Sequence, residues 1–167
     1  MTELRVGDKV PSFTLPDQDG KPFKLDDALA KGPLVLFFYP KDGTPGCTAE
    51  ACSFRDASAE FAAAGATVAG VSSDNVASHR RFVDQHSLSY PLLADEGGAL
   101  RKRLGVPRGM LGFVDGRVTY VIDASGVLRH RFDAMLRSTK HVEEALETLR
   151  SLQGSMPILN ADLAKER

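Results

Sequence analysis

The chain has 167 residues, enough for one domain with a full hydrophobic core. Its apolar content of 43% and charged content of 26% are ordinary for a globular protein, and its net charge of −1 argues against a polyanionic partner such as nucleic acid. No stretch approaches the roughly 18 apolar residues of a membrane span, and the first residues carry charges where a signal peptide would be apolar, so we expect a cytoplasmic protein.

Strand and helix patterns alternate along the chain. Segments 12–15 and 22–25 flank a turn at 17–20 and predict a hairpin. Apolar runs predict buried strands at 33–39, 66–71 and 118–122, and a further strand follows a turn, at 127–132. Helical patterns cover 47–64, 75–86, 98–104 and 138–152. This alternation predicts an α/β layered fold with some parallel strand pairing.

The last residues differ from the rest. We expect one domain over residues 1–153 and a carboxy-terminal tail over 154–167, because Gly154 and a nearby proline end the last helical pattern. The apolar side chains of Ile158, Leu159 and Leu163 could pack on the domain or on a partner. A mobile tail is the plainer interpretation.

The two cysteines, Cys47 and Cys52, are either two unrelated buried thiols or a reactive pair. They follow a buried strand and a loop rich in Gly and Pro. Thr44 followed by Pro45 predicts an N-cap and a first helical residue, which places Cys47 at the third position of a helix. Free N–H groups and the positive end of the helix dipole favour a thiolate there, and the thiolate is the nucleophilic form.

The helical period also predicts how the two thiols lie. Cys47, Ala51, Phe54 and Phe61 share one stripe, which puts Cys47 on the core-facing side. Cys52 lies about 140° around the axis and about 7.5 Å further along it, with the Cα atoms more than about 8 Å apart. A disulfide usually needs less than about 7 Å, so a bridge between them requires the first turns of the helix to unwind.

At this point the sequence resembles the peroxiredoxins. Pro40, Thr44 and Cys47 match their Pro-x-x-x-Thr-x-x-Cys motif after the apolar run 35–39. A second cysteine five residues on is similar to the PrxQ group, also called bacterioferritin comigratory protein, as is the later segment 105–123. The resemblance covers about residues 6–152. It implies a thioredoxin-like fold, in which a central mixed sheet is flanked by helices, with an N-terminal β-hairpin.

The resemblance also implies an activity. Cys47 would be the peroxidatic thiolate, which attacks hydrogen peroxide or an organic hydroperoxide and becomes a sulfenic acid. Cys52 would resolve it as an intramolecular disulfide, and thioredoxin or a similar dithiol would reduce the bridge. Such an enzyme needs no metal, haem or flavin cofactor. An intrachain resolving cysteine removes the need for a dimer, so we expect a monomer.

Three further residues take roles from the resemblance, and each has a plainer interpretation. Thr44 would hydrogen-bond the peroxide and the thiolate, or act as an N-cap. Pro40 would shield the pocket from water, or end the strand. Arg117 would place a guanidinium near the sulfur, although a lone Arg before a strand is usually solvated. Arg108 and Arg129 compete for that role.

The remaining candidates carry no clear pattern. The four histidines, His79, His86, His130 and His141, show no ligand spacing, and we expect them at the surface or at helix ends. Tyr39 and Phe113 either line the pocket or pack in the core.

Other functions stay open. A thiol–disulfide oxidoreductase would use the same fold and thiol, but usually carries Cys-x-x-Cys. A metal-delivery module would use both thiols as soft ligands. A third alternative is a peroxiredoxin-like domain that has lost its catalytic activity. The presence of the complete Pro, Thr, Cys and Arg set argues against it.

Overall fold

The structure, a computed structural model, describes residues 3–109, 114–137 and 139–155. Its centre is a five-stranded mixed sheet with the strand order β5-β4-β3-β8-β9. The bounds are β3 (Leu34–Phe38), β4 (Thr67–Ser72), β5 (Leu92–Ala94), β8 (Val118–Ile122) and β9 (Leu128–Asp133). Strand β3 runs parallel to β4, which runs parallel to β5, whereas β8 is antiparallel to both of its neighbours.

Strand β3 lies in the middle of the sheet and divides the core into two clusters. All of its residues are buried, as its unbroken apolar sequence predicts for a strand covered on both faces. Because side chains alternate along a strand, Val35 and Phe37 face one cluster, while Leu34, Leu36 and Phe38 face the other.

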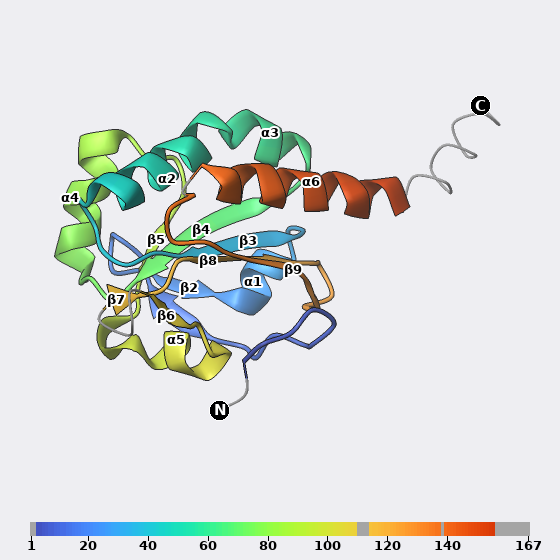
Figure 1. Cartoon of the computed structure of the whole chain (residues 1–167), viewed down its shortest axis with the longest axis horizontal. Helices are drawn as coiled ribbons and strands as arrows, with labels where there is room; N and C mark the ends of the chain where they lie inside the picture. Colours follow the sequence, from blue (N-terminus) through green and yellow to red (C-terminus); the bar gives the residue numbers. More distant parts are fainter. Residues whose placement is uncertain (1–2, 110–113, 138, 156–167) are drawn as a thin grey trace.

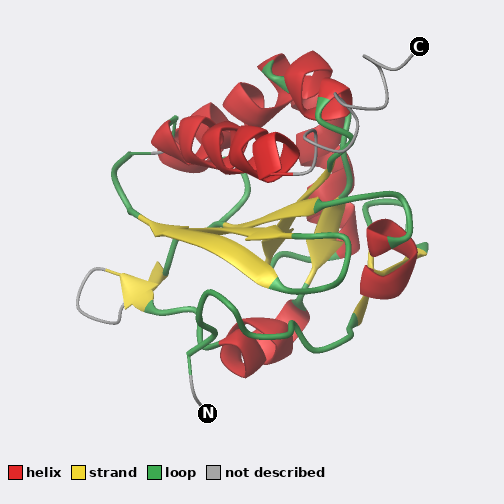
Figure 2. Cartoon of the chain, turned by 90° about the vertical axis from the view of Figure 1, so that its right-hand side faces the viewer, coloured by secondary structure: helices red, strands yellow, loops and turns green. Residues whose placement is uncertain are grey.

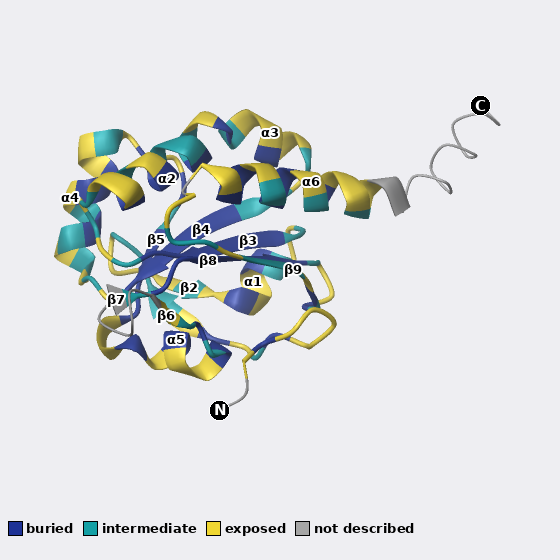
Figure 3. Cartoon of the chain, in the orientation of Figure 1, coloured by how far each residue is buried: buried dark blue, intermediate teal, exposed yellow. Residues whose placement is uncertain are grey.

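Helices cover both faces of the sheet. Figure 1 shows α2 (Pro45–Asp56), α3 (Ser58–Ala63) and α6 (Lys140–Ser155) on one side, and α1 (Leu25–Leu29) and α5 (Ala99–Leu104) on the other. Helix α4 (Val76–His86) contributes Phe82 and Val83 to the cluster that also contains Cys47. The turned view in Figure 2 shows the same layers, and Figure 3 shows buried strands between helices whose outer faces are exposed.

Two small antiparallel pairs complete the described fold. Strands β1 (Thr14–Pro16) and β2 (Pro22–Lys24) form the predicted amino-terminal hairpin. Strands β6 (Arg108–Gly109) and β7 (Val114–Asp115) form a second pair that the sequence patterns did not indicate, and the 3₁₀ turn Glu96–Gly98 precedes α5. The predicted fold, a central mixed sheet flanked by helices with an amino-terminal hairpin, is confirmed.

Some element boundaries differ from the prediction. The helix expected over 47–64 is two helices. The backbone of Ala57 leaves helical geometry (φ −92°, ψ 10°), and the Ser58 hydroxyl donates a hydrogen bond to the carbonyl of Arg55. Strand β5 and helix α1 were not predicted; both are too short for a clear period. Helix α6 continues through Gly154 to Ser155. Of the predicted tail, residues 156–167 lie outside the described residues.

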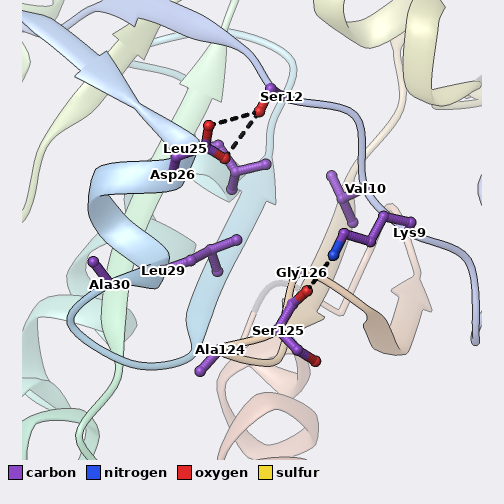
Figure 4. A pocket seen from close by; sticks show the side chains of 10 residues that line it. All are labelled: Lys9, Val10, Ser12, Leu25, Asp26, Leu29, Ala30, Ala124, Ser125 and Gly126. Atoms are coloured by element: carbon purple, nitrogen blue, oxygen red, sulfur yellow. Dashed lines mark hydrogen bonds between the residues drawn. The ribbon is translucent and has the colours of Figure 1, made fainter.

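A pocket opens on the face of the sheet that α1 covers. Figure 4 shows it between the amino-terminal segment, α1 and the turn at 124–126. Lys9 Nζ donates to the carbonyl of Ser125 (2.7 Å), and the Ser12 hydroxyl donates to the carboxylate of Asp26 (2.9 Å). Both cysteines belong to α2 on the opposite face, so this pocket is separate from them.

Among the residues that the structure describes, no helix has the length and apolar composition needed to cross a membrane.

Candidate active site

Cys47 lies in the first turn of α2, immediately after the central strand and its loop. Thr44 is the N-cap, with extended backbone angles (φ −77°, ψ 152°), and Pro45 is the first helical residue. Cys47 is therefore the third helical residue, as predicted. Its side chain packs into the core cluster with Phe54 and Phe37, and only 1% of the residue is exposed.

A guanidinium contacts the buried sulfur. Arg117 directly precedes β8, and its Nη2 lies 3.4 Å from Cys47 Sγ. Its Nη1 donates to Glu50 Oε1 (2.8 Å) and its Nε to the carbonyl of Met135 (3.1 Å). All three nitrogens thus have partners, which fixes the plane of the group. Arg117 is 3% exposed, so the solvated interpretation is wrong for it.

The charge of Arg117 is firmly held. Burial alone lowers the pKa of Arg117, but the neighbouring Glu50 and Cys47 outweigh burial and raise that pKa above its ordinary value. A permanent positive charge beside a sulfur favours the thiolate over the thiol.

Gly46 makes this approach possible. A Cβ at this position would lie 3.1 Å from Arg117 Nη2, closer than ordinary van der Waals contact. The missing side chain therefore gives the guanidinium room to reach the sulfur of the next residue. Here glycine is required by close approach, not by backbone conformation.

Glu50 completes the set on α2. It lies one turn after Cys47 and is completely buried. Burial raises the pKa of Glu50 to about 8, although the charge and hydrogen bond of Arg117 act in the opposite direction. Its second oxygen, Oε2, has no hydrogen-bond partner among the described residues.

Arg101 of α5 connects the segments that carry Cys47 and Arg117. Its Nη2 donates to the carbonyl of Tyr39 (2.9 Å), just after β3, and its Nη1 donates to the carbonyl of Gly116 (2.9 Å), just before Arg117. Its guanidinium also lies over the ring of Phe38. One buried cation thus holds the loops of two adjacent strands in register.

Asp42 fixes the loop between β3 and α2. Its carboxylate accepts from the Tyr39 hydroxyl (2.6 Å) and the Ser78 hydroxyl (2.9 Å), and lies 2.7 Å from His79 Nδ1. The other ring nitrogen of His79 donates to the carbonyl of Leu93 (3.0 Å). This loop is therefore tied to α4 and β5 before the helix begins.

The remaining predicted residues are placed as follows. The Thr44 hydroxyl donates to the carbonyl of Lys41 (3.1 Å) and makes no capping hydrogen bond, so Thr44 is an N-cap by backbone position alone. Pro40 is half-buried directly after the strand. Arg108 and Arg129 pair with Asp115 and Asp123. Neither takes the place of Arg117 beside Cys47.

Cys52 is half-buried in the same uninterrupted helix, and both cysteines are free thiols. Because α2 is continuous from Pro45 to Asp56, the two sulfurs cannot bridge without a change in the helix.

The expectation of surface or helix-end histidines is wrong for His79, which is completely buried inside α4. His141 lies at a helix end, in the first turn of α6, yet it too is completely buried. His86 and His130 are partly exposed, as expected.

Tyr39 is buried in the core, and Phe113 lies outside the described residues. Within the described ranges, no group of three or more His, Cys, Asp and Glu side chains is arranged to hold a metal ion.

Sequence reasoning missed Gly46, Glu50, Arg101 and His141. Glu50 had a signal, because it follows Cys47 by three residues and shares its face of the helix. The other three depend on contacts between distant segments, which no local pattern encodes.

The family follows from comparison with known proteins. The AhpC/TSA family model matches residues 6–131, which include Cys47, Glu50 and Arg117. The chain belongs to the AhpC/TSA family. Among curated proteins it is 46% identical to a chloroplastic Peroxiredoxin Q of Populus jackii over 150 residues, or 90% of this chain and 70% of that protein. Chloroplastic Peroxiredoxin Q of Suaeda salsa is 47% identical over 152 residues, 91% of this chain and 71% of that one.

Solved peroxiredoxin structures share the fold. Peroxidoxin BcpB of Mycobacterium tuberculosis superposes with a TM-score of 0.83 at 42% identity, covering 89% of this chain and 98% of that one. A PrxQ mutant of Xylella fastidiosa gives a TM-score of 0.82 at 28% identity, covering 92% and 99%. The resemblance to the PrxQ group is therefore confirmed, and with it the thioredoxin-like fold. This peroxiredoxin is a thiol-dependent peroxidase.

Proposed function

We propose that Cys47 is the peroxidatic residue of this peroxiredoxin and that Arg117 activates it. The observation that carries the proposal is the contact between Arg117 Nη2 and Cys47 Sγ, at 3.4 Å, in the first turn of a helix. Two independent sources of positive potential, the guanidinium and the helix amino terminus, act on one buried sulfur.

The reaction consists of two covalent steps. The Cys47 thiolate attacks the distal oxygen of the hydroperoxide, the S–O bond forms as the O–O bond breaks, and the alkoxide or hydroxide takes a proton and leaves as an alcohol or water. The Cys52 thiolate then attacks the sulfur of the Cys47 sulfenic acid, the S–S bond forms as the S–O bond breaks, and the hydroxide takes a proton and leaves as water.

Arg117 serves the first step in two ways. It stabilises the thiolate before attack, and it stays beside the oxygen on which negative charge develops as the O–O bond breaks. The Thr44 hydroxyl, which donates to Lys41, keeps its oxygen lone pairs free to accept a hydrogen bond from the substrate. Pro40, which follows the buried end of β3, limits the access of water to the Cys47 sulfur.

The substrates and the reductant extend this proposal. A Xanthomonas campestris bacterioferritin comigratory protein, 31% identical with a TM-score of 0.75, is described by its alkyl peroxide reduction activity. We therefore expect organic hydroperoxides as well as hydrogen peroxide to oxidise Cys47. Thioredoxin or a similar dithiol returns the disulfide to two thiols, by exchange through Cys52 or Cys47.

The proposal also covers assembly, extent and location. An intrachain disulfide needs no second subunit, so the enzyme works as a monomer. Residues 1–153 make up the catalytic domain, and residues 154–167 its tail. We retain the cytoplasm as the proposed location, while the plant relatives above are named as chloroplastic. Fractionation of the source cells tests the location, and sedimentation of the reduced protein tests the monomer.

The decisive experiment is stopped-flow oxidation of the reduced protein by hydrogen peroxide and by an organic hydroperoxide. Mass spectrometry of the peptide that contains both cysteines then follows the product. We expect rapid oxidation and a loss of two hydrogens from that peptide, with no reaction in Cys47→Ser. A wild-type thiol that ignores both peroxides would refute the assignment of Cys47.

A further inference from the structure

A chain of buried polar groups continues from the active site to the first turn of α6 and to β8. It runs from Cys47 to Arg117, then to Glu50 on α2, to His141 on α6 and to Thr119 on β8. Glu50 and His141 are completely buried, and Thr119 is 1% exposed. The family motif includes neither His141 nor Thr119, and the reaction proposed above does not use them.

The hydrogen-bond partners of His141 fix its tautomer. Its Nε2 lies 2.9 Å from the carbonyl of Ala134, and a carbonyl oxygen only accepts, so Nε2 carries a hydrogen. In the neutral ring, Nδ1 therefore presents a lone pair. The Thr119 hydroxyl lies 2.7 Å from Nδ1 and Glu50 Oε2 lies 3.5 Å from it. The edge-on packing of Phe132 against the ring, with centroids 4.7 Å apart, holds this orientation.

The contact between Glu50 and His141 requires a proton. A carboxylate oxygen and an imidazole lone pair repel each other, and Glu50 Oε2 has no hydrogen-bond partner among the described residues. One proton between them removes the repulsion, whichever group carries it. Burial raises the pKa of Glu50 to about 8 and lowers that of His141 to about 4, and both directions put the proton on Glu50 near neutral pH.

The position of this proton matters to the sulfur. An ionised Glu50 would compensate the charge of Arg117 through their 2.8 Å contact. A protonated Glu50 keeps the guanidinium in place by accepting from Nη1 with Oε1, while leaving its charge to act on Cys47. The groups that face Glu50 are Cys47 on its own helix, Arg117 and Thr119 at β8, His141 on α6, and Tyr90 before β5, which donates to the carbonyl of Ala51.

We propose that His141 is a positioning residue of the peroxidatic site. With the Thr119 hydroxyl donating to Nδ1, the electron-rich side of the His141 ring faces Glu50 Oε2 and favours the protonated carboxyl of Glu50, which leaves the charge of Arg117 directed at the Cys47 sulfur. This inference rests on the proposed role of Cys47. It adds a second consequence: peroxide attack slows at alkaline pH because Glu50 ionises and compensates the charge of Arg117.

The test compares four variants with the wild type. His141→Phe removes both ring nitrogens, and His141→Asn restores a polar group near the position of Nδ1. Glu50→Gln fixes the side chain at position 50 in a neutral form at every pH. His130→Gln removes a histidine that pairs with Glu144 outside this chain of contacts and serves as the matched control.

Two measurements are made from about pH 6 to about pH 9. The first is the second-order rate constant of oxidation by hydrogen peroxide in stopped flow. The second is the alkylation rate of Cys47 by iodoacetamide in a Cys52→Ser background, which reports the thiolate without any peroxide. Thermal unfolding of each variant runs alongside them.

We expect the wild-type oxidation rate to fall above about pH 8, and Glu50→Gln to lack that fall. His141→Phe should lower the rate at pH 7 about tenfold, the scale of one lost hydrogen bond to a charged network, and slow the alkylation of Cys47. His141→Asn should recover most of the rate, and His130→Gln should follow the wild type.

Other outcomes overturn the inference. If His141→Phe unfolds more easily but keeps the wild-type pH profile and thiol titration, His141 only packs. If His141→Phe does not fold, Glu50→Gln decides, and an unchanged alkaline fall refutes the role of Glu50. Failure of the proposed function looks different: wild-type Cys47 would not react with peroxide at any pH, while its alkylation would still be measurable.

Discussion

The sulfur of Cys47 and the guanidinium of Arg117 are 70 residues apart in the sequence and 3.4 Å apart in the fold. Antiparallel pairing of β3 with β8 brings them together, because Phe38 at the end of one strand lies opposite Val118 at the start of the other. Cys47 comes after the carboxyl end of β3, and Arg117 comes just before the amino end of β8, so both lie at the same end of these two strands.

Arg117→Lys should slow peroxide attack about a hundredfold, the scale of losing one pre-positioned donor in an active site. Lysine keeps the charge, but its single ammonium cannot contact Glu50, Met135 and the sulfur in one plane. Stopped-flow oxidation measures the effect. Arg129→Lys, at a half-exposed arginine that pairs with Asp123, is the control. Equal rates for Arg117→Lys and wild type would move the activating role elsewhere.

Gly46→Ala should separate activity from stability. The new Cβ lies 3.1 Å from Arg117 Nη2, so the guanidinium must move by a few tenths of an ångström. We expect attack to slow about fivefold to tenfold, since small misplacements of catalytic groups are costly. Stability should not fall, because alanine favours a helix over glycine by about 1 kcal/mol. Ser53→Ala on the same helix controls for a general effect, and an unaltered rate in Gly46→Ala would contradict the packing argument.

Cys52→Ser should still undergo the first oxidation but should not recycle normally. The Cys47 sulfenic acid then has no neighbouring thiol and proceeds to the sulfinic form at excess peroxide. Mass spectrometry detects this as two added oxygens on the Cys47 peptide. In wild type, the amide hydrogens of residues 45–54 should exchange faster in the disulfide form than in the reduced form, because the bridge unwinds α2. Full thioredoxin-dependent turnover by Cys52→Ser, or equal protection in both forms, would refute this role.

Asp42→Ala should destabilise the protein by about 3 kcal/mol, because it leaves several buried polar groups without their acceptor. Those groups are the Tyr39 and Ser78 hydroxyls and His79. Asp42→Asn should cost less, since its carbonyl can still accept from the Tyr39 hydroxyl and its side chain keeps nearly the same volume. Urea unfolding of both variants measures the difference. Equal losses would show that the volume of the side chain, and not its hydrogen bonds, fixes the loop.

Stability should fall as the pH rises from about 6.5 to about 8. Burial raises the pKa of Glu50 from 4.5 to about 8, so in that interval the folded protein holds a proton that the unfolded chain has released. Burial lowers the pKa of His141 from 6.5 to about 4, which makes stability rise with pH, but only below 6.5. Of these two groups, only Glu50 changes the stability above 6.5, and the measurement uses a Cys47→Ser background so that the thiolate of Cys47 adds no slope of opposite sign.

The expected loss is about 2 kcal/mol over that interval, at about 1.4 kcal/mol per pH unit. Urea unfolding at several pH values measures it. Glu50→Gln should show no such slope, whereas Glu60→Gln, at an exposed glutamate, should behave like wild type. A Cys47→Ser stability that is flat or rising between pH 6.5 and 8 would contradict a buried, protonated Glu50.

The sequence patterns predicted most strands of the central sheet, but not all of the elements around them. Strand β8 has the bounds predicted from its apolar run, and β3 and β4 differ by a residue or two. Strand β5 was not predicted because a segment of a few residues has no measurable period. The break between α2 and α3 at Ala57 was not predicted because a hydrogen bond from a Ser hydroxyl to a backbone carbonyl can end a helix without Gly or Pro. The prediction for α6 stopped before Gly154, which the helix includes.

By itself, the sequence determined where the reactive sulfur lies: Thr44, Pro45 and the buried strand before them place Cys47 in the opening turn of a helix, since caps and periods are local. Only the tertiary structure decided what surrounds that sulfur. Arg117, Glu50, Gly46 and His141 meet there because β8 pairs with β3 and α6 packs against β8 and α2. Burial is a property of the whole fold, so the free energy of a proton on Glu50 or His141 is set by segments far away in the chain.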